Sequence, residues 1–327
     1  MTSSTEAPGA SRTRVPDFFI VGHAKCGTTA LYEMLRRHPE IYMPDLKEPA
    51  FFAGDVRRRV QRRAAGPLPQ TLEEYLALFE AARPEQRVGE ASSLYLWSHE
   101  APGAIARAQP DARIIAILRE PASFLHSLHL QLLQNHIETQ KSLRKAIALE
   151  QDRREGRHVP RRSPQPPALQ YSERVRYVEQ LRRFHEAFAP EQVQVLIYDD
   201  FRDDNDATVR RVQRFLEVDD TLAIETTQAN RTVRLRSQQL DDLVHAVSVG
   251  HGPLGTVAKA TVTALTPKRL RSGALRVAQR RVVHGAAAPP DEALMLELRR
   301  RFAPEVVALS EYLGRDLVEL WGYDSLN

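Results

Sequence analysis

Residues 22–29 (Gly-His-Ala-Lys-Cys-Gly-Thr-Thr) bring together the groups that bind a phosphate or sulfate anion. Lys25 supplies a mobile positive charge, and Thr28 and Thr29 supply hydroxyl donors. The apolar run 18–21 predicts a buried strand before this loop, and the apolar spacing after it predicts a helix. A strand, a loop of small residues and a helix together aim backbone N–H groups and the positive end of the helix dipole at one anion.

The position of the lysine indicates which anion is bound. In the loop of nucleotide triphosphatases the lysine directly follows the second glycine and reaches the β and γ phosphates. Here Thr28 occupies that position, and Lys25 comes two residues before Gly27. A P-loop kinase or another triphosphatase stays open as an alternative, because Asp199 or Asp200, after a later apolar run, could supply its metal-binding carboxylate.

A second anion site is predicted where the apolar run 113–118 ends at Arg119. Ligands of open α/β sheets bind at the carboxyl ends of the strands. The guanidinium fork of an arginine donates two hydrogen bonds to two oxygens of a terminal phosphate. Pro121 suits the first turn of a following helix. Ser127, two turns along that helix, is able to face the same crevice as Arg119.

The patterns K-x-G-T-T and R-x-P-x-x-x-x-x-S resemble the two nucleotide motifs of sulfotransferases that use 3′-phosphoadenosine 5′-phosphosulfate (PAPS) and release PAP. One departure is that the family often has a second arginine where this chain has Phe124. The resemblance implies that one group of residues holds the 5′-phosphosulfate and another holds the 3′-phosphate. These groups are, respectively, Lys25, Cys26, Gly27, Thr28 and Thr29, and Arg119 and Ser127.

Residues 47–52 (Lys-Glu-Pro-Ala-Phe-Phe) resemble the K-E-P-x-F-F segment of bacterial and carbohydrate sulfotransferases. The resemblance implies that Glu48 is the base, because an alcohol loses its proton as it attacks sulfur. Lys25 would stabilise the charge on the bridging oxygen during an in-line displacement that needs no metal. If the base lies elsewhere, His126 and His23 are the next candidates.

Weaker matches extend the resemblance over residues 16–327. Residues 89–96 are similar to a G-E-x-S-x-x-Y-L segment of the family, and residues 298–323, with Gly314 as a helix stop, resemble its closing helix. Carbohydrate members often have a lysine at the position of Ala91. We therefore expect the acceptor hydroxyl to belong to a small molecule, as in secondary metabolism, with a glycolipid or a sugar as alternatives. A non-catalytic nucleotide-binding protein is the other alternative.

The pattern of apolar runs predicts an α/β fold with a P-loop-like parallel sheet and helices on both faces. We expect strands near 18–21, 87–89, 113–118 and 193–198, separated by helices. Residues 71–74 (Thr-Leu-Glu-Glu) have the pattern of a capping box at a helix start. The prediction is one domain, 16–327, after a disordered tail of residues 1–15.

Charge and cysteine content limit the classes of function. The net charge is +4, and residues 251–290 hold seven Lys or Arg and no Asp or Glu. We expect this segment and residues 151–170 to be basic and mobile; they could steer the cosubstrate, cover the site or contact a membrane surface. No nucleic-acid motif is present.

The same survey predicts no metal site, no signal peptide in the tail and no membrane span. One cysteine fits a reducing compartment, so we expect a cytoplasmic protein. We expect Cys26 to contribute its backbone N–H; a thiol activated by the helix start is the other interpretation.

Overall fold

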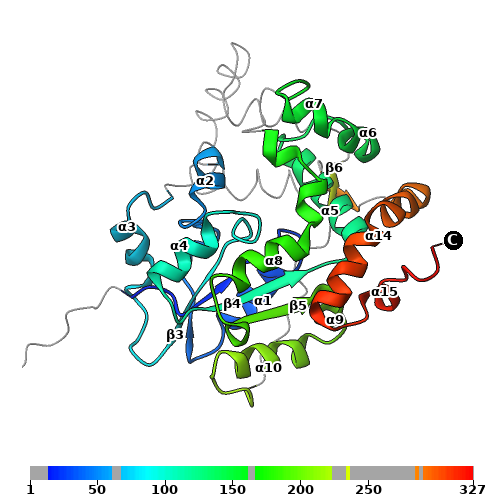
Figure 1. Cartoon of the computed structure of the whole chain (residues 1–327). Coiled ribbons are helices and arrows are strands. Elements are labelled where there is room, and N and C mark those ends of the chain that lie inside the picture. The colour runs from blue at the N-terminus through cyan, green and yellow to red at the C-terminus, as the bar shows by residue number, and fades with distance from the viewer. Residues whose placement is uncertain are drawn as a thin grey trace, which may run out of the picture.

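Five parallel strands form a sheet at the centre of the computed structural model (Figure 1), which describes residues 14–60, 68–160, 166–222, 233–235, 284–286 and 290–326. The strand order is β2-β3-β1-β4-β5. The strands are β1 (Phe18–Ile20), β2 (Ile41–Tyr42), β3 (Arg87–Ala91), β4 (Arg113–Leu118) and β5 (Val193–Ile197). The sequence predicts four of these strands; β2 is missed because two residues are too short to form an apolar run.

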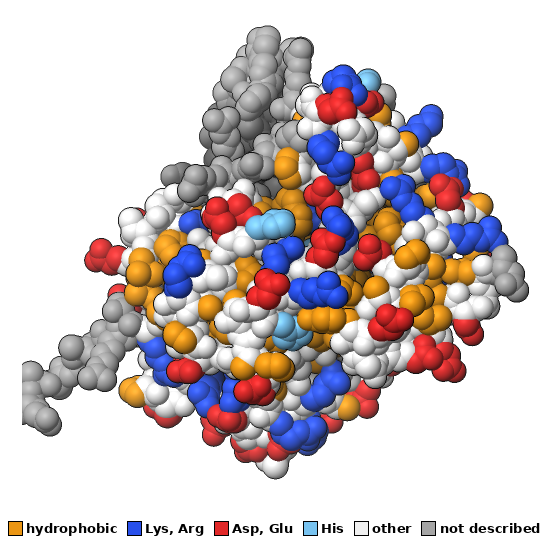
Figure 2. Space-filling model, viewed as in Figure 1, with side chains coloured by type: hydrophobic (Ala, Val, Ile, Leu, Met, Phe, Trp, Pro, Cys, Tyr) orange, Lys and Arg blue, Asp and Glu red, His pale blue; other side chains and the backbone are white. Residues whose placement is uncertain are grey.

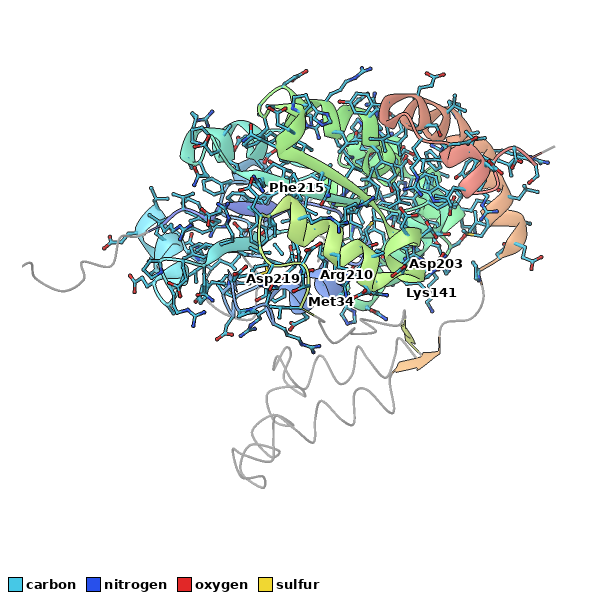
Figure 3. All side chains as sticks on the ribbon, turned by 90° about the horizontal axis from the view of Figure 1, so that it is seen from below. Met34, Lys141, Asp203, Arg210, Phe215 and Asp219 are labelled. Carbon is cyan, nitrogen blue, oxygen red and sulfur yellow. The ribbon has the colours of Figure 1, made fainter. Side chains whose placement is uncertain are left out.

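Helices cover both faces of this sheet (Figure 1), which confirms the predicted fold class. Helix α1 (Thr28–Leu35) contacts β3 and α10 (Asn205–Phe215), while α4 (Ala101–Ala108) contacts α8 (Tyr177–His185). In Figure 3, seen from below, α10 lies beside α1, which carries Met34. Helix α14 (Glu292–Leu313) packs against α5 (Pro121–Gln134) and α8.

Shorter elements complete the described part of the chain. An antiparallel pair joins β6 and β7. The other α-helices described are α2 (Gly54–Val60), α3 (Leu72–Leu76), α6 (Leu143–Ala148), α7 (Glu150–Arg154), α9 (Tyr198–Asp203) and α15 (Leu317–Leu320). The pair consists of β6 (Val233–Leu235) and β7 (His284–Ala286). Among the described residues, no helix is both long enough and apolar enough to cross a bilayer.

Capping residues that are recognisable in the sequence lie at the ends of three of these helices. Helix α5 begins at Pro121, where the missing N–H costs no hydrogen bond, and the carboxylate of Glu120 accepts the N–H groups of the next two residues. Thr71 caps α3 as predicted. The capping box is incomplete, because the Glu74 carboxylate accepts from the N–H of Gln70 rather than from that of Thr71. Gly314, with φ of 61°, ends α14 as predicted.

The register of the strands brings the predicted site residues to one edge of the sheet. Phe18 of β1 lies opposite Gly89 of β3 and Arg113 of β4, and all three strands run in the same direction. Their carboxyl ends therefore meet at one edge. The loop of residues 21–27, the turn after β3 and Arg119 all leave the sheet there.

The structure describes the two predicted basic segments to different extents. Within 151–170, the guanidinium of Arg153 is buried and forms a bidentate ion pair with Glu138 at 2.7 and 2.8 Å. This side chain is therefore held in the interior, and the mobility expected for 151–170 stays a prediction. Apart from β7 and Pro290, the segment 251–290 lies outside the described residues, as does most of the tail. On the face shown in Figure 2, acidic and basic side chains are interspersed.

Candidate active site

The loop between β1 and α1 needs glycine at both ends. A Cβ on Gly22 would lie 2.7 Å from the backbone N and O of Ile117, so only glycine lets the loop pass this close to β4. Gly27 has φ of 94°, a left-handed conformation that L side chains rarely adopt, and a Cβ there would press on the rings of Tyr198 and Phe201. Steric constraints thus explain why both of these motif positions are glycine.

The first turn of α1 presents backbone donors to this loop. The Leu31 N–H donates to the Gly27 carbonyl at 3.1 Å, and no side chain of the described residues caps the helix. The N–H groups before Leu31 point out of the helix end. Thr28 is buried and Thr29 is half-buried at this end. The Cys26 N–H donates to the His23 carbonyl at 3.3 Å, so in this structure it holds the loop together.

Two cations meet beside the helix end. The Arg119 guanidinium donates to the Lys25 carbonyl at 3.1 Å, and burial together with the charge of Arg119 lowers the pKa of Lys25. Among the residues that the structure describes, neither side chain has a carboxylate within ion-pair distance. Lys25 also has φ of 71°, which shows that the loop holds a strained backbone. Two adjacent, uncompensated cations favour a bound anion.

Arg119 is fixed from several sides. Its guanidinium lies 4.7 Å from the centre of the Tyr198 ring, and its carbonyl accepts from the Tyr177 hydroxyl at 2.9 Å. Ser127 is buried on α5, the helix that follows Arg119. Beside it on this helix, His126 has its pKa lowered by burial and by the charge of Arg119. The structure therefore brings the loop, Arg119 and this part of α5 into one region.

Glu48 is held at the same edge by the turn after β3. Its carboxylate accepts from the Ser93 N–H at 2.7 Å and the Ser93 hydroxyl at 2.9 Å, and it pairs with Lys47. The Glu48 N–H donates to the carbonyl of Ala91. The side chain is 36% exposed, so a substrate could reach it. The turn itself bonds to the end of β1 through the Ser92 N–H and the carbonyl of Ile20.

The sequence analysis missed two groups near this site. Glu90 is fully buried in β3, and burial raises its pKa to about 7. Arg174 is buried with its guanidinium 3.4 Å from the centre of the Trp97 ring, and burial lowers its pKa to about 9. The G-E-x-S pattern contained Glu90, but the letters alone did not show that its carboxylate is buried. No sequence signal pointed to Arg174.

Two alternative roles in the loop do not fit the structure. Burial lowers the pKa of His23 to about 3, its Nε2 lies 2.7 Å from Gln180 Oε1, and its ring stacks on Phe124 at 5.1 Å. This buried imidazole is poorly placed to take a proton from a substrate. Cys26 is buried, and burial raises the pKa of its thiol to about 12, which favours the role of its backbone N–H over an activated thiol.

The aspartates after β5 are bound to the C-terminal segment. Asp199 accepts from the indole N–H of Trp321 at 2.9 Å, and Asp200 forms a bidentate ion pair with Arg315 that lowers the pKa of Asp200. In the described part of the chain, no group of three or more His, Cys, Asp or Glu could hold a metal ion. These contacts favour a structural role for both carboxylates over the metal-binding role of a triphosphatase.

Comparisons with known proteins identify the family. A sequence model described as the sulfotransferase family matches residues 16–221, which is more than half of the chain. The chain belongs to the sulfotransferase family. This confirms the family predicted from the loop and from the Arg119 motif.

Curated relatives of this sulfotransferase match part of it. Carbohydrate sulfotransferase 15 of Mus musculus is 33% identical over a region that covers 36% of this chain and 27% of that protein. Heparan sulfate glucosamine 3-O-sulfotransferase 6 of Mus musculus is 33% identical over 39% of this chain and 33% of that protein. The chain thus matches about a third or less of the length of these relatives.

A solved structure matches this sulfotransferase over nearly its whole length. The crystal structure of a sulfotransferase from Alicyclobacillus acidocaldarius is 26% identical, with a TM-score of 0.63, and the match covers 94% of this chain and 98% of that one. The fold is that of a sulfotransferase.

Proposed function

We propose that this sulfotransferase transfers a sulfuryl group from PAPS to a hydroxyl group and releases PAP. The observation that carries the proposal is the hydrogen bond from the Arg119 guanidinium to the Lys25 carbonyl. It places two cations, neither with a carboxylate partner among the described residues, beside the start of α1. A cosubstrate with a 5′-phosphosulfate and a 3′-phosphate supplies the negative charge that such a site lacks.

Each end of the nucleotide has its own group of residues in this proposal. The N–H groups at the start of α1, with Thr28 and Thr29, hold the 5′-phosphosulfate, and Lys25 stabilises the charge that grows on the bridging oxygen. Arg119 holds the 3′-phosphate, with Ser127 on the following helix. As in phosphoryl transfer, most of the catalysis comes from positioning and charge neutralisation.

Glu48 is the proposed base for the acceptor hydroxyl. Ser93 fixes one carboxylate oxygen through two hydrogen bonds, and Lys47 contacts the other. An ionised carboxylate has about four acceptor positions, so one remains for the acceptor hydroxyl. As that hydroxyl attacks sulfur in line, its proton passes to Glu48 and the bridging oxygen leaves with PAP.

The acceptor is proposed to be a small-molecule or carbohydrate hydroxyl. Ala91, at the position where carbohydrate members often have a lysine, is 1% exposed and offers no charge to an anionic sugar. This favours a small molecule, although the curated relatives are named for carbohydrate and heparan sulfate substrates. The single cysteine supports action in a reducing compartment such as the cytoplasm.

Transfer of labelled sulfate tests the function. The protein is incubated with PAPS labelled in the sulfuryl group and a metabolite extract, and the products are identified by mass. We expect a labelled sulfate ester that forms with wild type and is greatly reduced with Lys25→Ala. A labelled phosphate ester formed from ATP and magnesium, with no sulfate ester from PAPS, would contradict the proposal and favour a kinase.

A further inference from the structure

A buried carboxylate lies under the segment that carries Glu48. Glu90 of β3 has no exposed surface, and its two oxygens accept hydrogen bonds from three hydroxyl groups. Tyr75 and Tyr95 donate to Oε2 at 2.5 and 2.9 Å, and Ser92 donates to Oε1 at 2.5 Å. The function proposed above assigns no role to these groups.

Two of the three hydroxyls reach further, to residues 48–52, here named the Glu48 loop. The Ala50 N–H donates to the Ser92 hydroxyl at 2.9 Å, and the Phe52 N–H donates to the Tyr95 hydroxyl at 3.4 Å. A hydroxyl has one proton, and here it goes to Glu90. Because an ionised carboxylate only accepts, it orients both hydroxyls so that their lone pairs face the amides of the loop.

The backbone of the Glu48 loop needs such support. Glu48 has φ of 64° and Ala50 has φ of 48°, a left-handed region that costs non-glycine residues free energy. A strained conformation persists only when its surroundings fix it. The fixed points are the hydrogen bonds to Ala91, Ser92 and Ser93, all at the end of the strand that carries Glu90.

We propose that Glu90 is a positioning residue for sulfuryl transfer, which holds the Glu48 loop through Ser92 and Tyr95 so that the Glu48 carboxylate meets the acceptor hydroxyl. The inference rests on the role proposed for Glu48. Glu90 itself does not touch the substrate.

The charge of Glu90 is part of this arrangement. The ionisable groups around it are Glu48, Tyr75, Tyr95 and Arg57, and burial is the main cause that raises its pKa to about 7. A proton on Glu90 turns one acceptor into a donor, so the carboxyl no longer fixes the protons of all three hydroxyls and its hold on the loop weakens. We expect the turnover of wild type to fall as pH decreases through about 7.

Three variants and one matched control test the proposal. Glu90→Gln keeps the shape but adds a donor, Ser92→Ala removes the link to Ala50, and Tyr95→Phe removes the link to Phe52. Tyr75→Phe is the control, because the Tyr75 hydroxyl bonds to Glu90 and Tyr95 rather than to the backbone of the Glu48 loop. All four variants keep the nucleotide residues intact.

The first measurement is turnover, followed as PAP release in the presence of the acceptor found by labelled transfer. We expect kcat to fall about 10- to 100-fold in Glu90→Gln, Ser92→Ala and Tyr95→Phe, and less than about threefold in Tyr75→Phe. PAP affinity should stay within about twofold of wild type. Glu90→Gln should also lose the decline in kcat near pH 7. Equal losses in Tyr75→Phe and Tyr95→Phe, or loss of PAP affinity together with kcat, would overturn the proposal.

The second measurement does not depend on the reaction. Amide hydrogen exchange of peptides that contain residues 48–52 should be faster in Ser92→Ala and Tyr95→Phe than in wild type and Tyr75→Phe. Unchanged exchange contradicts the proposed hold on the loop. Changed exchange in a protein that transfers no sulfuryl group would instead show that the proposed function is wrong while Glu90 still orders the loop. If Glu90→Gln does not fold, the single-hydroxyl variants still decide the result.

Discussion

Lys25 and Glu48 are assigned to different atoms of one transition state, so their variants should fail differently. Glu48→Gln keeps the hydrogen-bonding shape of the side chain but cannot take a proton. We expect it to bind PAP as wild type does and to lose about 10²–10⁴ in kcat, the usual contribution of a general base. Steady-state kinetics and calorimetric titration with PAP measure the two effects separately.

His126→Ala is the control for this prediction. His126 lies on α5 with its pKa lowered by burial and by Arg119, so it is the remaining histidine candidate, whereas His23 is buried against Gln180. We expect His126→Ala to keep most of its turnover. Near-normal turnover in Glu48→Gln, with a large loss in His126→Ala, would show that His126 on α5, and not Glu48, is the base.

The affinity for PAP should depend on pH through Lys25. Burial and Arg119 lower the pKa of this lysine in the free protein, whereas a bound anion favours the protonated form. Binding therefore takes up protons, and PAP affinity should decrease as pH rises, at a lower pH than for an ordinary lysine. Titration calorimetry in buffers of different ionisation enthalpy measures this uptake. Lys25→Met, as control, should lose it; a Lys25→Met protein with unchanged proton uptake would assign the effect to another group.

Arg119 should contribute specifically to binding of the 3′-phosphate. Arg119→Ala removes a pair of charge-assisted hydrogen bonds, so PAP binding should weaken by about 2–4 kcal/mol. Adenosine 5′-phosphosulfate lacks the 3′-phosphate, and its weak affinity should change little. Arg119→Lys keeps the charge without the fork and should give an intermediate loss. If both ligands lose affinity equally, Arg119 acts through its hydrogen bond to the Lys25 carbonyl.

The site residues that could be predicted from the sequence are those that belong to short contiguous motifs. Lys25, Arg119 and Glu48 stand in short patterns with a chemical meaning of their own, and the structure places all three at the carboxyl edge of the sheet. Their contacts with ligand stay predictions. Glu90 was missed as a functional residue because its importance depends on burial and on hydroxyls from Tyr75 and Ser92, which only the fold brings to it.

Among the elements, the C-terminal segment supports the strand ends that form the site. Tyr323 donates to the Glu120 carboxylate at 2.6 Å, and the same carboxylate caps the start of α5. Trp321 and Arg315 bind the two aspartates after β5. The apolar face of α14 was evident in the sequence, but these polar contacts were not, because their partners lie more than 100 positions away.

Removing the Tyr323 hydroxyl should therefore destabilise the protein. Tyr323→Phe leaves the buried Glu120 carboxylate without one charged hydrogen bond, so the free energy of unfolding should fall by about 1.5–3 kcal/mol. Ser325→Ala is the control in the same segment, since Ser325 is exposed and bonds at 3.3 Å within its own turn. Urea unfolding of both variants measures the difference. Equal stability of Tyr323→Phe and Ser325→Ala would show that the segment does not support α5.

At the scale of the whole molecule, the fold class and family followed from the spacing of motifs along the chain. The acceptor did not, because no motif in the sequence identifies the groups that would contact it. Opposite charges are interspersed on the face in Figure 2, so net charge does not identify the acceptor either. The nucleotide is a different case, since short motifs contain the side chains that we propose to bind its charged groups.

The choice of nucleotide can be read from the stability of the whole protein. A ligand that binds the native state at 100 times its dissociation constant adds about 2.7 kcal/mol to the free energy of unfolding. PAP should reach this stabilisation at far lower concentration than AMP or ATP with magnesium, because Arg119 supplies a partner for a 3′-phosphate while the lysine that clamps a triphosphate is missing. Thermal unfolding over a titration of each nucleotide measures the ranking, and Arg119→Ala should reduce the advantage of PAP over AMP. Equal stabilisation by ATP with magnesium at the same concentration would contradict a PAPS site and favour a triphosphatase.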